Sequence, residues 1–374
     1  MRSSTGSALI LLLAVAIVPA ADTNLMNLVM PDARMISGFN IERAKASPFG
    51  QFLLSQMAAS DPDFEKFVAA TGFDPRRDLH EMLFASAGTP DSAHAIVLVR
   101  GLFDSPRIEA MAKLNGAIIR AYKGVAVMHG TQRGGPWSFN MGATKADGAF
   151  AFLDNTTAVL GDARSLHSVI DRRVGGRGLN PRLAARAQQL SEQYDIWGVS
   201  MMPVSEWASK VPDENVSGVM QGDALRSIEQ SSGGIRFGKV IEISGEAITR
   251  SEKDATALAD VIRFLTGLLQ LNQKDARITG PAKLLQSLDL RTEGNVMKLS
   301  LLVPEAELEK FILEAKAQAQ KTAAARKTRA PSGTLAPSAT QPSSGMQPPP
   351  RRPAPAAQSG GLTIHSSEGT IQIK

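Results

Sequence analysis

Two glycine-rich stretches have a spacing that phosphate chemistry can use. Residues 233–239 read GGIRFGK, which holds the Gly-x4-Gly-Lys spacing of a phosphate-binding loop. Such a loop follows a strand, opens a helix and carries Ser or Thr after its lysine. Here Val240 follows the lysine and the stretch precedes a predicted strand, so we interpret it as a glycine turn entering that strand. Gly175–Gly178 follows a predicted helix, which favours a linker over a dinucleotide-binding turn.

Histidine and cysteine chemistry has little support in the sequence. The five histidines are scattered, with no pair at a ligand spacing such as His-x3-His: His80, His94, His129, His167 and His365. His80 and Glu81 are expected on different sides of a helix, and His167 on the surface of another. The absence of cysteine excludes thiol nucleophiles, disulfides and zinc fingers. We therefore expect no metal site and no cofactor.

Three carboxylates stand at predicted strand ends, where active sites often lie: Asp104, Asp154 and Asp162. Asp is also a preferred turn and capping residue, and we favour that interpretation. The alternative is a hydrolase that acts on envelope polymers through two carboxylates. It predicts a concave pocket with two acidic groups within ~10 Å of each other, and spacing in the sequence leaves it open.

An apolar cluster surrounds two of the tryptophans, at Trp197, Met201, Met202, Pro203 and Trp207. It fits either a binding patch or a core that is poor in aromatic residues, which make up 5% of the chain. We favour the core. The sequence thus predicts no catalytic, cofactor-binding or metal-binding residue.

The positive charge of the chain belongs to its C-terminal tail. The formal net charge is +5, but residues 316–360 hold seven basic and no acidic residues, and residues 361–374 hold one of each. Residues 1–315 therefore carry +5 − 7 = −2. A dedicated nucleic-acid-binding domain would carry a basic face of its own, so we expect no nucleic-acid partner.

Residues 1–21 have the features of a secretory signal peptide. Arg2 gives the positive start, residues 8–18 form an apolar run, and Val18-Pro19-Ala20 offers a cleavage site. The run is shorter than the ~20 residues that a spanning helix needs. We expect an exported protein, periplasmic or secreted, that meets the membrane only if the signal is not cleaved.

The clearest structural pattern lies in residues 235–313. A strand from Ile235 to Ala247 alternates apolar and polar residues, which predicts a sheet with one buried and one exposed face. Ser251 and Asp254 then match a helix cap, and an apolar stripe continues to residue 269. A further alternating strand precedes Pro304, which fits the first turn of a last helix.

The pattern of residues 22–173 predicts a first module, which also combines strands and helices. Strands are expected at 35–41, at the buried run 94–101, and in four short segments at 118–130, 137–143, 148–154 and 156–162. Several helices should begin with a capping residue before proline, at Ser47, Asp61, Asp74, Ser105 and Asn180. A helix at 163–173 closes the module.

The second module, 195–315, repeats the order of the first. Residues 195–202 correspond to 33–41, and the segment from Leu225 corresponds to that from Leu79. In both segments we expect a helix that leads through glycine to a strand and a capped helix. A linker at 174–194, with a short helix after Asn180-Pro181, joins the modules.

The C-terminal tail has two parts. Residues 316–360 form a basic linker rich in Pro, Ala and Ser, with the composition of a disordered segment. Residues 361–374 regain alternation around a turn at 366–369, which predicts a hairpin. A lone hairpin is marginal in water, so we expect this one to dock on an exposed sheet edge, its own or a partner's.

The signal, the segments SPFGQFLL and TGFDPRRDL, and VLGDARSLHSVIDRR resemble exported bacterial proteins of unknown function built from repeated α+β modules. The resemblance covers residues 25–315 and implies no site residues. We expect an α+β protein of two related antiparallel modules with helices on one face of each, followed by a disordered tail. We interpret it as a non-enzymatic binding or scaffolding protein of the cell envelope. Its partner would be an envelope protein or anionic polymer held by the tail; polyanion binding through the basic residues alone is a further alternative.

Overall fold

The computed structural model describes nine segments of the chain: 23–58, 64–88, 94–130, 148–175, 178–206, 222–271, 284–328, 363–366 and 369–372. It forms two compact units, Met1–Gln320 and Lys321–Lys374, each described by itself. Several predictions fall outside the described residues: the signal peptide at 1–21, the cap at Asp61, the strand at 137–143, Trp207, and the linker over 329–360.

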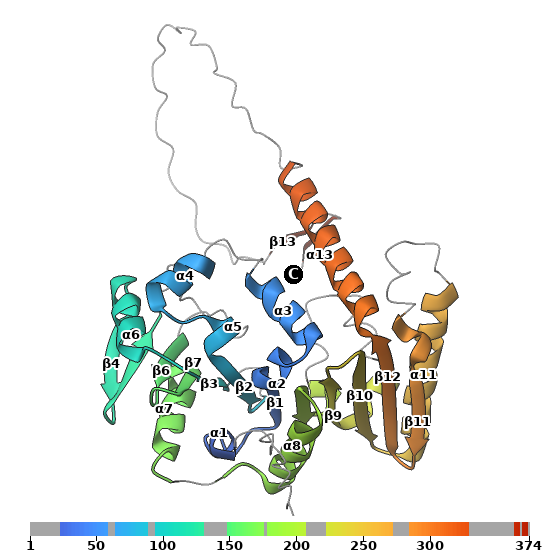
Figure 1. The fold of residues 1–374 in the computed structure, drawn as a ribbon. Coiled ribbons are helices and arrows are strands. Elements are labelled where there is room, and N and C mark those ends of the chain that lie inside the picture. Colours follow the sequence, from blue (N-terminus) through green and yellow to red (C-terminus); the bar gives the residue numbers. More distant parts are fainter. Residues whose placement is uncertain are drawn as a thin grey trace, which may run out of the picture. The chain divides into compact units, whose positions relative to one another are not determined.

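One antiparallel sheet of twelve strands organises the first unit (Figure 1). Its order is β11-β12-β10-β9-β8-β1-β2-β3-β7-β6-β5-β4. The first seven strands in the chain are β1 (Met35–Asn40), β2 (Leu79–Ser86), β3 (Ala95–Gly101), β4 (Ile118–Tyr122), β5 (Val125–His129), β6 (Gly148–Phe152) and β7 (Thr157–Asp162). The other five are β8 (Ile196–Ser200), β9 (Ile228–Arg236), β10 (Val240–Thr249), β11 (Asp289–Glu293) and β12 (Val296–Pro304). The α+β class with an antiparallel sheet is confirmed.

The sheets of the two predicted modules are continuous, because β1 pairs with β8. On each side of this pair the chain adds two more strands, then a helix, then a hairpin that returns to the sheet. The helices are α6 (Ser105–Leu114) and α11 (Glu252–Leu271), and the first half has the hairpin β4–β5 in addition. This is the order that the predicted repeat requires, while duplication itself stays a prediction.

Helices lie on both sides of the sheet. One side, here called the α8 face, is covered by α1 (Thr23–Asn27), α7 (Ala163–Arg172) and α8 (Pro181–Gln193). The opposite side, called the α11 face, is covered by α6, α11 and shorter helices. These are α2 (Ile41–Lys45), α3 (Pro48–Ala58), α4 (Phe64–Thr71), α5 (Pro75–Asp78), η1 (Val204–Glu206) and α10 (Asp223–Arg226), while η3 (Leu285–Ser287) precedes β11.

The first half of the sheet departs from the prediction of helices on one face only. In β3, Ile96 and Leu98 join the core under α1, α7 and α8, whereas Val97 and Val99 join the core on the α11 face. A strand without polar alternation can be buried on both sides, and the run AIVLVRG has that pattern. The core of this half is therefore double.

The second half follows the prediction. In β10, Ile241 and Ala247 are buried on the α11 face, where Ala255 and Leu258 of α11 pack. The alternate residues of β10 turn to the α8 face and are partly exposed. From β10 to β12 one side of the sheet is therefore covered and the other is polar, whereas α8 still covers β8 on the α8 face.

Helix caps match the sequence in most places. The Ser251 Oγ accepts the backbone N–H of Asp254 at 3.2 Å, and Asp74 and Asn180 cap the helices that follow them. The α6 cap is Asp104 rather than Ser105, which occupies the first helical position. The predicted linker helix, α8, spans 13 residues and is part of the core, with Leu183 and Leu190 buried.

Two segments expected to be helical are strands. Residues 79–86 form β2 between β1 and β3, and residues 228–236 form β9 between β8 and β10. The strand predicted from Ile235 is a hairpin, because β9 ends at Arg236 and β10 begins at Val240. Tertiary pairing overrides local propensity in such central positions.

The segment 118–130 is likewise a hairpin rather than one strand. Lys123 and Gly124 have φ angles of +47° and +81°, the backbone of a two-residue turn whose twist suits paired strands. β4 and β5 flank this turn and pair over five residues each.

The last helix, α13 (Glu305–Thr328), begins after Pro304 as predicted and continues into the second unit. In that unit β13 (Thr363–Ser366) pairs with β14 (Gly369–Gln372), and Ile364 lies opposite Ile371. The paired residues are those of the predicted hairpin, and its docking stays a prediction.

Gly38→Ala should destabilise the fold by about 1–3 kcal/mol, because a Cβ there would lie 2.5 Å from the ring of buried Trp197. Gly198→Ala is the matched control in the adjacent strand, where a Cβ would make an ordinary 3.5 Å contact. Urea unfolding of both variants checks this. Equal stabilities would contradict the proposed close packing across the β1–β8 junction.

Candidate functional site

The three acids singled out at strand ends act as turn and cap residues. Asp104 caps α6, Asp162 caps α7, and Asp154 holds the turn between β6 and β7. Each accepts a hydrogen bond from a backbone N–H two or three residues further along the chain. The sequence interpretation of these residues agrees with their geometry.

A Ser, a His and an Asp meet at the start of α7, but not in the geometry of a catalytic triad. The Ser165 Oγ lies 3.5 Å from His94 Nδ1, and the Asp162 Oδ2 lies 3.7 Å from the same nitrogen. A triad needs the serine and the carboxylate on different ring nitrogens, so that one accepts the proton while the other is held. Here both groups lie on the same ring nitrogen, so Asp162 does not hold His94 from the side opposite Ser165.

The other histidines are dispersed. His80 lies on strand β2 rather than a helix, with Nε2 3.7 Å from Glu42 Oε1, and His167 stacks on Tyr122 at a ring distance of 3.9 Å. His129 ends β5 and His365 lies in β13. Within the described part of the chain, no three His, Asp or Glu side chains gather as metal ligands would.

The remaining sequence candidates have structural positions. Gly233 and Gly234 lie inside β9, and the GGIRFGK stretch leads through a hairpin turn into β10 rather than into a helix, as a phosphate-binding loop would. The Lys239 carbonyl accepts the backbone N–H of Glu305 at 3.2 Å, which is a structural contact at the start of α13. Trp197 is buried against Gly38, and Met202 is buried near Gly88, which places both in the core. Gly175 follows α7 and, with Gly178, lines the pocket described below.

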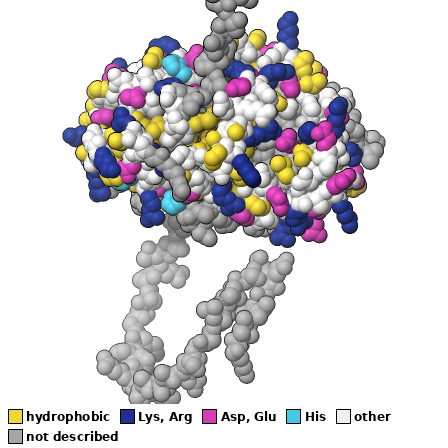
Figure 2. All heavy atoms as spheres, turned by 90° about the horizontal axis from the view of Figure 1, so that it is seen from below, with side chains coloured by type: hydrophobic (Ala, Val, Ile, Leu, Met, Phe, Trp, Pro, Cys, Tyr) yellow, Lys and Arg dark blue, Asp and Glu magenta, His cyan; other side chains and the backbone are white. Residues whose placement is uncertain are grey.

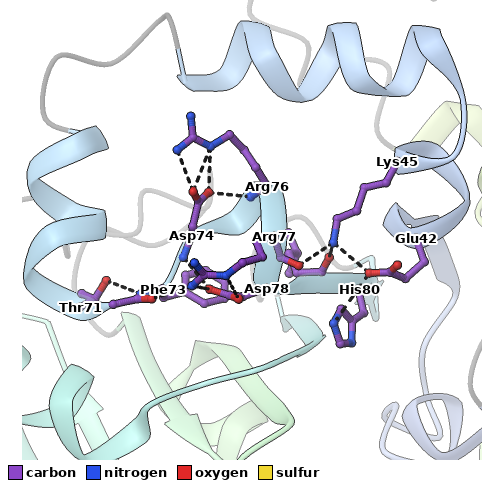
Figure 3. A network of polar contacts seen from close by, with 11 residues as sticks. Glu42, Lys45, Thr71, Phe73, Asp74, Arg76, Arg77, Asp78 and His80 are labelled. Carbon is purple, nitrogen blue, oxygen red and sulfur yellow. Dashed lines mark hydrogen bonds and ion pairs between the residues drawn. The ribbon is translucent and has the colours of Figure 1, made fainter.

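A dense polar network lies where α5 meets β2 (Figure 3). The Arg76 guanidinium donates to both oxygens of Asp74, at 2.9 and 2.7 Å, and Arg77 donates to both oxygens of Asp78, at 2.7 and 2.8 Å. The Lys45 ammonium donates to Glu42 and to two backbone carbonyls. These charged groups are already engaged with one another, so the network stabilises the fold and leaves little for a ligand.

The first unit contains a different polar site, here called the arginine pocket. It has a volume of about 720 Å³ and lies between α1, the end of α7, and the ends of β3, β6 and β7. Its polar lining includes Asn24, Asn27, Arg100, Asp154, Thr157, Arg172 and Arg173. Three arginines and one aspartate give this lining a net charge of +2 at neutral pH.

Arg172 is the residue that distinguishes this pocket. Its Nε donates to the Leu28 carbonyl at 3.0 Å and its Nη1 to the Ser168 Oγ at 2.7 Å. Its Nη2 is buried and donates to no residue that the structure describes. A buried charged donor without an acceptor is costly, and an anion bound near this guanidinium would lower that cost.

Burial lowers the pKa of Arg172, while the carboxylates of Asp32 and Asp171 act to raise it. An arginine stays protonated under ordinary conditions, so the group remains a fixed cation. Asp171 is itself held by Lys123 at 2.7 Å and by the Tyr122 hydroxyl at 3.2 Å. The arrangement suits an anion beside the Arg172 guanidinium.

Sequence reasoning missed Arg172. It stands beside Arg173 at the end of a helix, where basic residues are expected for their interaction with the helix dipole. The Leu28 carbonyl just after α1 accepts from its Nε, and Arg100 of β3 lines the same pocket, although both are distant in the sequence. Only the folded chain brings them together.

Charges of both signs are interspersed on the face seen in Figure 2. No described helix is both long and apolar enough to cross a membrane. No family model matches the chain, and no curated protein does. The resemblance to a family of exported proteins therefore stays a prediction.

Among solved structures, crystal forms of TP0453 resemble this chain. Form I has a TM-score of 0.40 at 9% identity, over 77% of this chain and 95% of TP0453. Form III has a TM-score of 0.45 at 8% identity, over 77% and 96%. A likeness of this degree carries no information on ligand or activity.

Asp78→Asn should flatten the loss of stability in acid. Hydrogen bonds from Arg77 lower the pKa of Asp78 below its ordinary 3.8, and those from Arg76 do the same for Asp74. A depressed folded-state pKa gives stability that is complete above pH 3.8 and lost as the pH falls through the lower folded value. Urea unfolding at about five pH values between about 2.5 and 7 measures how steeply the free energy of unfolding falls with decreasing pH.

Arg77→Gln removes the donor instead of the acid and should flatten the same acid limb. If the free energy of unfolding of both variants fell with decreasing pH as steeply as that of the wild type, the stabilising role of the Arg77–Asp78 pair would be contradicted.

Proposed function

We propose that this protein is an exported, non-enzymatic binding protein of the bacterial cell envelope, and that it takes a small anion in the arginine pocket. The observation that carries the proposal is the buried Nη2 of Arg172, which has no acceptor among the described residues. The positive net charge of the pocket lining also favours a negatively charged ligand.

The physical reason lies in the cost of an unsatisfied guanidinium. Nε and Nη1 are fixed by Leu28 and Ser168, so the side chain cannot turn its last donor to water without losing those bonds. A carboxylate or phosphate oxygen supplies a charge-assisted acceptor, and such bonds are about twice as strong as neutral ones. The amide of Asn27 lines the same pocket and offers a further donor to the anion.

The non-enzymatic part of the proposal rests on the titratable groups near the pocket. Asp154 is occupied by the Thr156 backbone and hydroxyl at 2.8 and 2.7 Å, and Asp171 by Lys123. Neither is arranged as a general acid or base beside a nucleophile. Binding without conversion is the simplest use of this geometry.

The location and the partner are parts of the same proposal. The apolar segment at 8–18 after Arg2 supports export. The hairpin β13–β14, with Ile364 opposite Ile371, supports strand addition to an envelope protein or attachment to an anionic envelope polymer.

Arg172→Gln should weaken binding of inorganic phosphate or succinate by about tenfold or more, since it removes a charged donor. Titration calorimetry at constant ionic strength measures the affinity. Arg164→Gln, an exposed change on the same helix, is the matched control and should bind as the wild type does.

A second variant, Asn27→Asp, keeps Arg172 and adds a negative charge to the exposed rim of the pocket. It should therefore also weaken the binding of the anion. The proposal is overturned if the wild type takes up neither anion saturably, or if both pocket variants bind like the control.

Deleting residues 330–374 should leave the melting temperature of the first unit nearly unchanged, because that unit ends at Gln320. The same deletion should abolish co-sedimentation with isolated envelope fragments. Full co-sedimentation of the truncated protein would refute the role of the tail and leave the pocket proposal untouched.

A further inference from the structure

The α8 face changes character at the junction of the two halves. From β5 to β11 a single cross-strand row of residues follows the register of the sheet, and all its members point to this face. In the first half the row is apolar: Val127, Ala151, Val159, Leu98 and Leu83. It passes Gly38 and Trp197, then becomes Gly234, Ser244, Ser300 and Asp289.

Helices cover the apolar part of this row, whereas the polar part forms the floor of an open cavity of about 470 Å³. A second row beside it, Ser232, Glu246, Lys298 and Arg291, completes the floor. Arg186 of α8 and Tyr194 form one wall. We call this cavity the serine trough.

The charges of the serine trough are neutralised among themselves. Arg186 lies 3.2 Å from Glu246 and donates to the Ser232 hydroxyl at 2.9 Å. Asp289 pairs with Arg291 at 2.8 Å.

The remaining cation of the floor, Lys298, pairs with Glu293 at 2.6 Å. Each charged side chain of the trough thus has a partner of opposite sign, in contrast to Arg172 in the arginine pocket. A charged ligand would have to break one of these pairs, whereas a neutral ligand would not.

The floor offers short hydroxyl side chains at regular spacing. Ser244 and Ser300 are neighbours on adjacent strands, which lie about 4.8 Å apart in a sheet. A hydroxyl both donates and accepts, so such a pair complements a ligand that presents neighbouring hydroxyls of its own.

Gly234 has no side chain, so the Tyr194 ring packs directly on it at the edge of the trough. The partly exposed ring offers an apolar surface with a polar tip beside the hydroxyls.

We propose that the serine trough binds a neutral oligosaccharide. Such a ligand combines closely spaced hydroxyls with apolar ring faces and carries no charge that would compete with the three ion pairs. The site lies on the second half of the sheet and does not share its lining with the arginine pocket. It is therefore independent of the anion proposal.

Titration of the full chain with chitotetraose, cellotetraose and maltotetraose, followed by calorimetry, tests the proposal. At least one should bind saturably, and Ser244→Val and Ser300→Val should each weaken it by about tenfold, because they remove a hydroxyl and narrow the floor. Thr292→Val, the same kind of change on the opposite face of β11, is the control and should bind normally. Melting temperatures establish that all three variants fold.

The proposal is overturned if none of the three oligosaccharides binds, or if the two serine variants bind like Thr292→Val. Binding of a sulfated heparin tetrasaccharide in preference to the neutral ones would overturn it as well. Arg172→Gln should bind the oligosaccharide unchanged, which separates this result from the test of the arginine pocket.

Discussion

The pairing of β1 with β8 is the constraint on which the rest of the molecule depends. It joins two half-sheets into one and lays the Trp197 ring on Gly38, where a side chain at residue 38 would collide with it. The same junction brings α8 onto the sheet, so a segment between the halves becomes part of the core. The arginine pocket lies where the helices of the first half end, and the serine trough begins where α8 stops covering the sheet.

Much of the fold is encoded locally. Alternation in β10 and β12, the caps at Ser251 and Asp74, and the amphipathic α11 can all be predicted from adjacent residues, because each depends on a period or a neighbouring N–H. The strands β2 and β9 were predicted as helices. Their conformation is decided by two partner strands on either side, which local propensity does not register. The double core of the first half has the same origin, although the unbroken apolar run of β3 is a visible sign of it.

The candidate sites could not be predicted from the sequence, for a related reason. Arg172 looks like an ordinary helix-ending arginine until α1 and β3 bury it, and Ser244 and Ser300 look like the exposed side of a sheet. Their significance lies in what surrounds them: one guanidinium nitrogen lacks an acceptor, while the charges near the serines are already paired. Conversely, the residues that attract attention in the sequence, such as Asp104, Asp162 and the GGIRFGK segment, are explained by caps and a strand. A motif shows residue type and spacing, but whether a polar group is satisfied depends on the whole fold.

The register of the central pair also has a consequence for biogenesis. Met35 is aligned with Ser200, so the first half is synthesised long before the strand that completes its edge. Until β8 emerges, β1 presents unpaired N–H and C=O groups along one side, which is the condition under which nascent β-proteins associate wrongly. A chain built this way benefits from late folding, after the whole polypeptide is available. The vulnerable interval is then set by the distance along the chain between β1 and β8, rather than by the stability of either half.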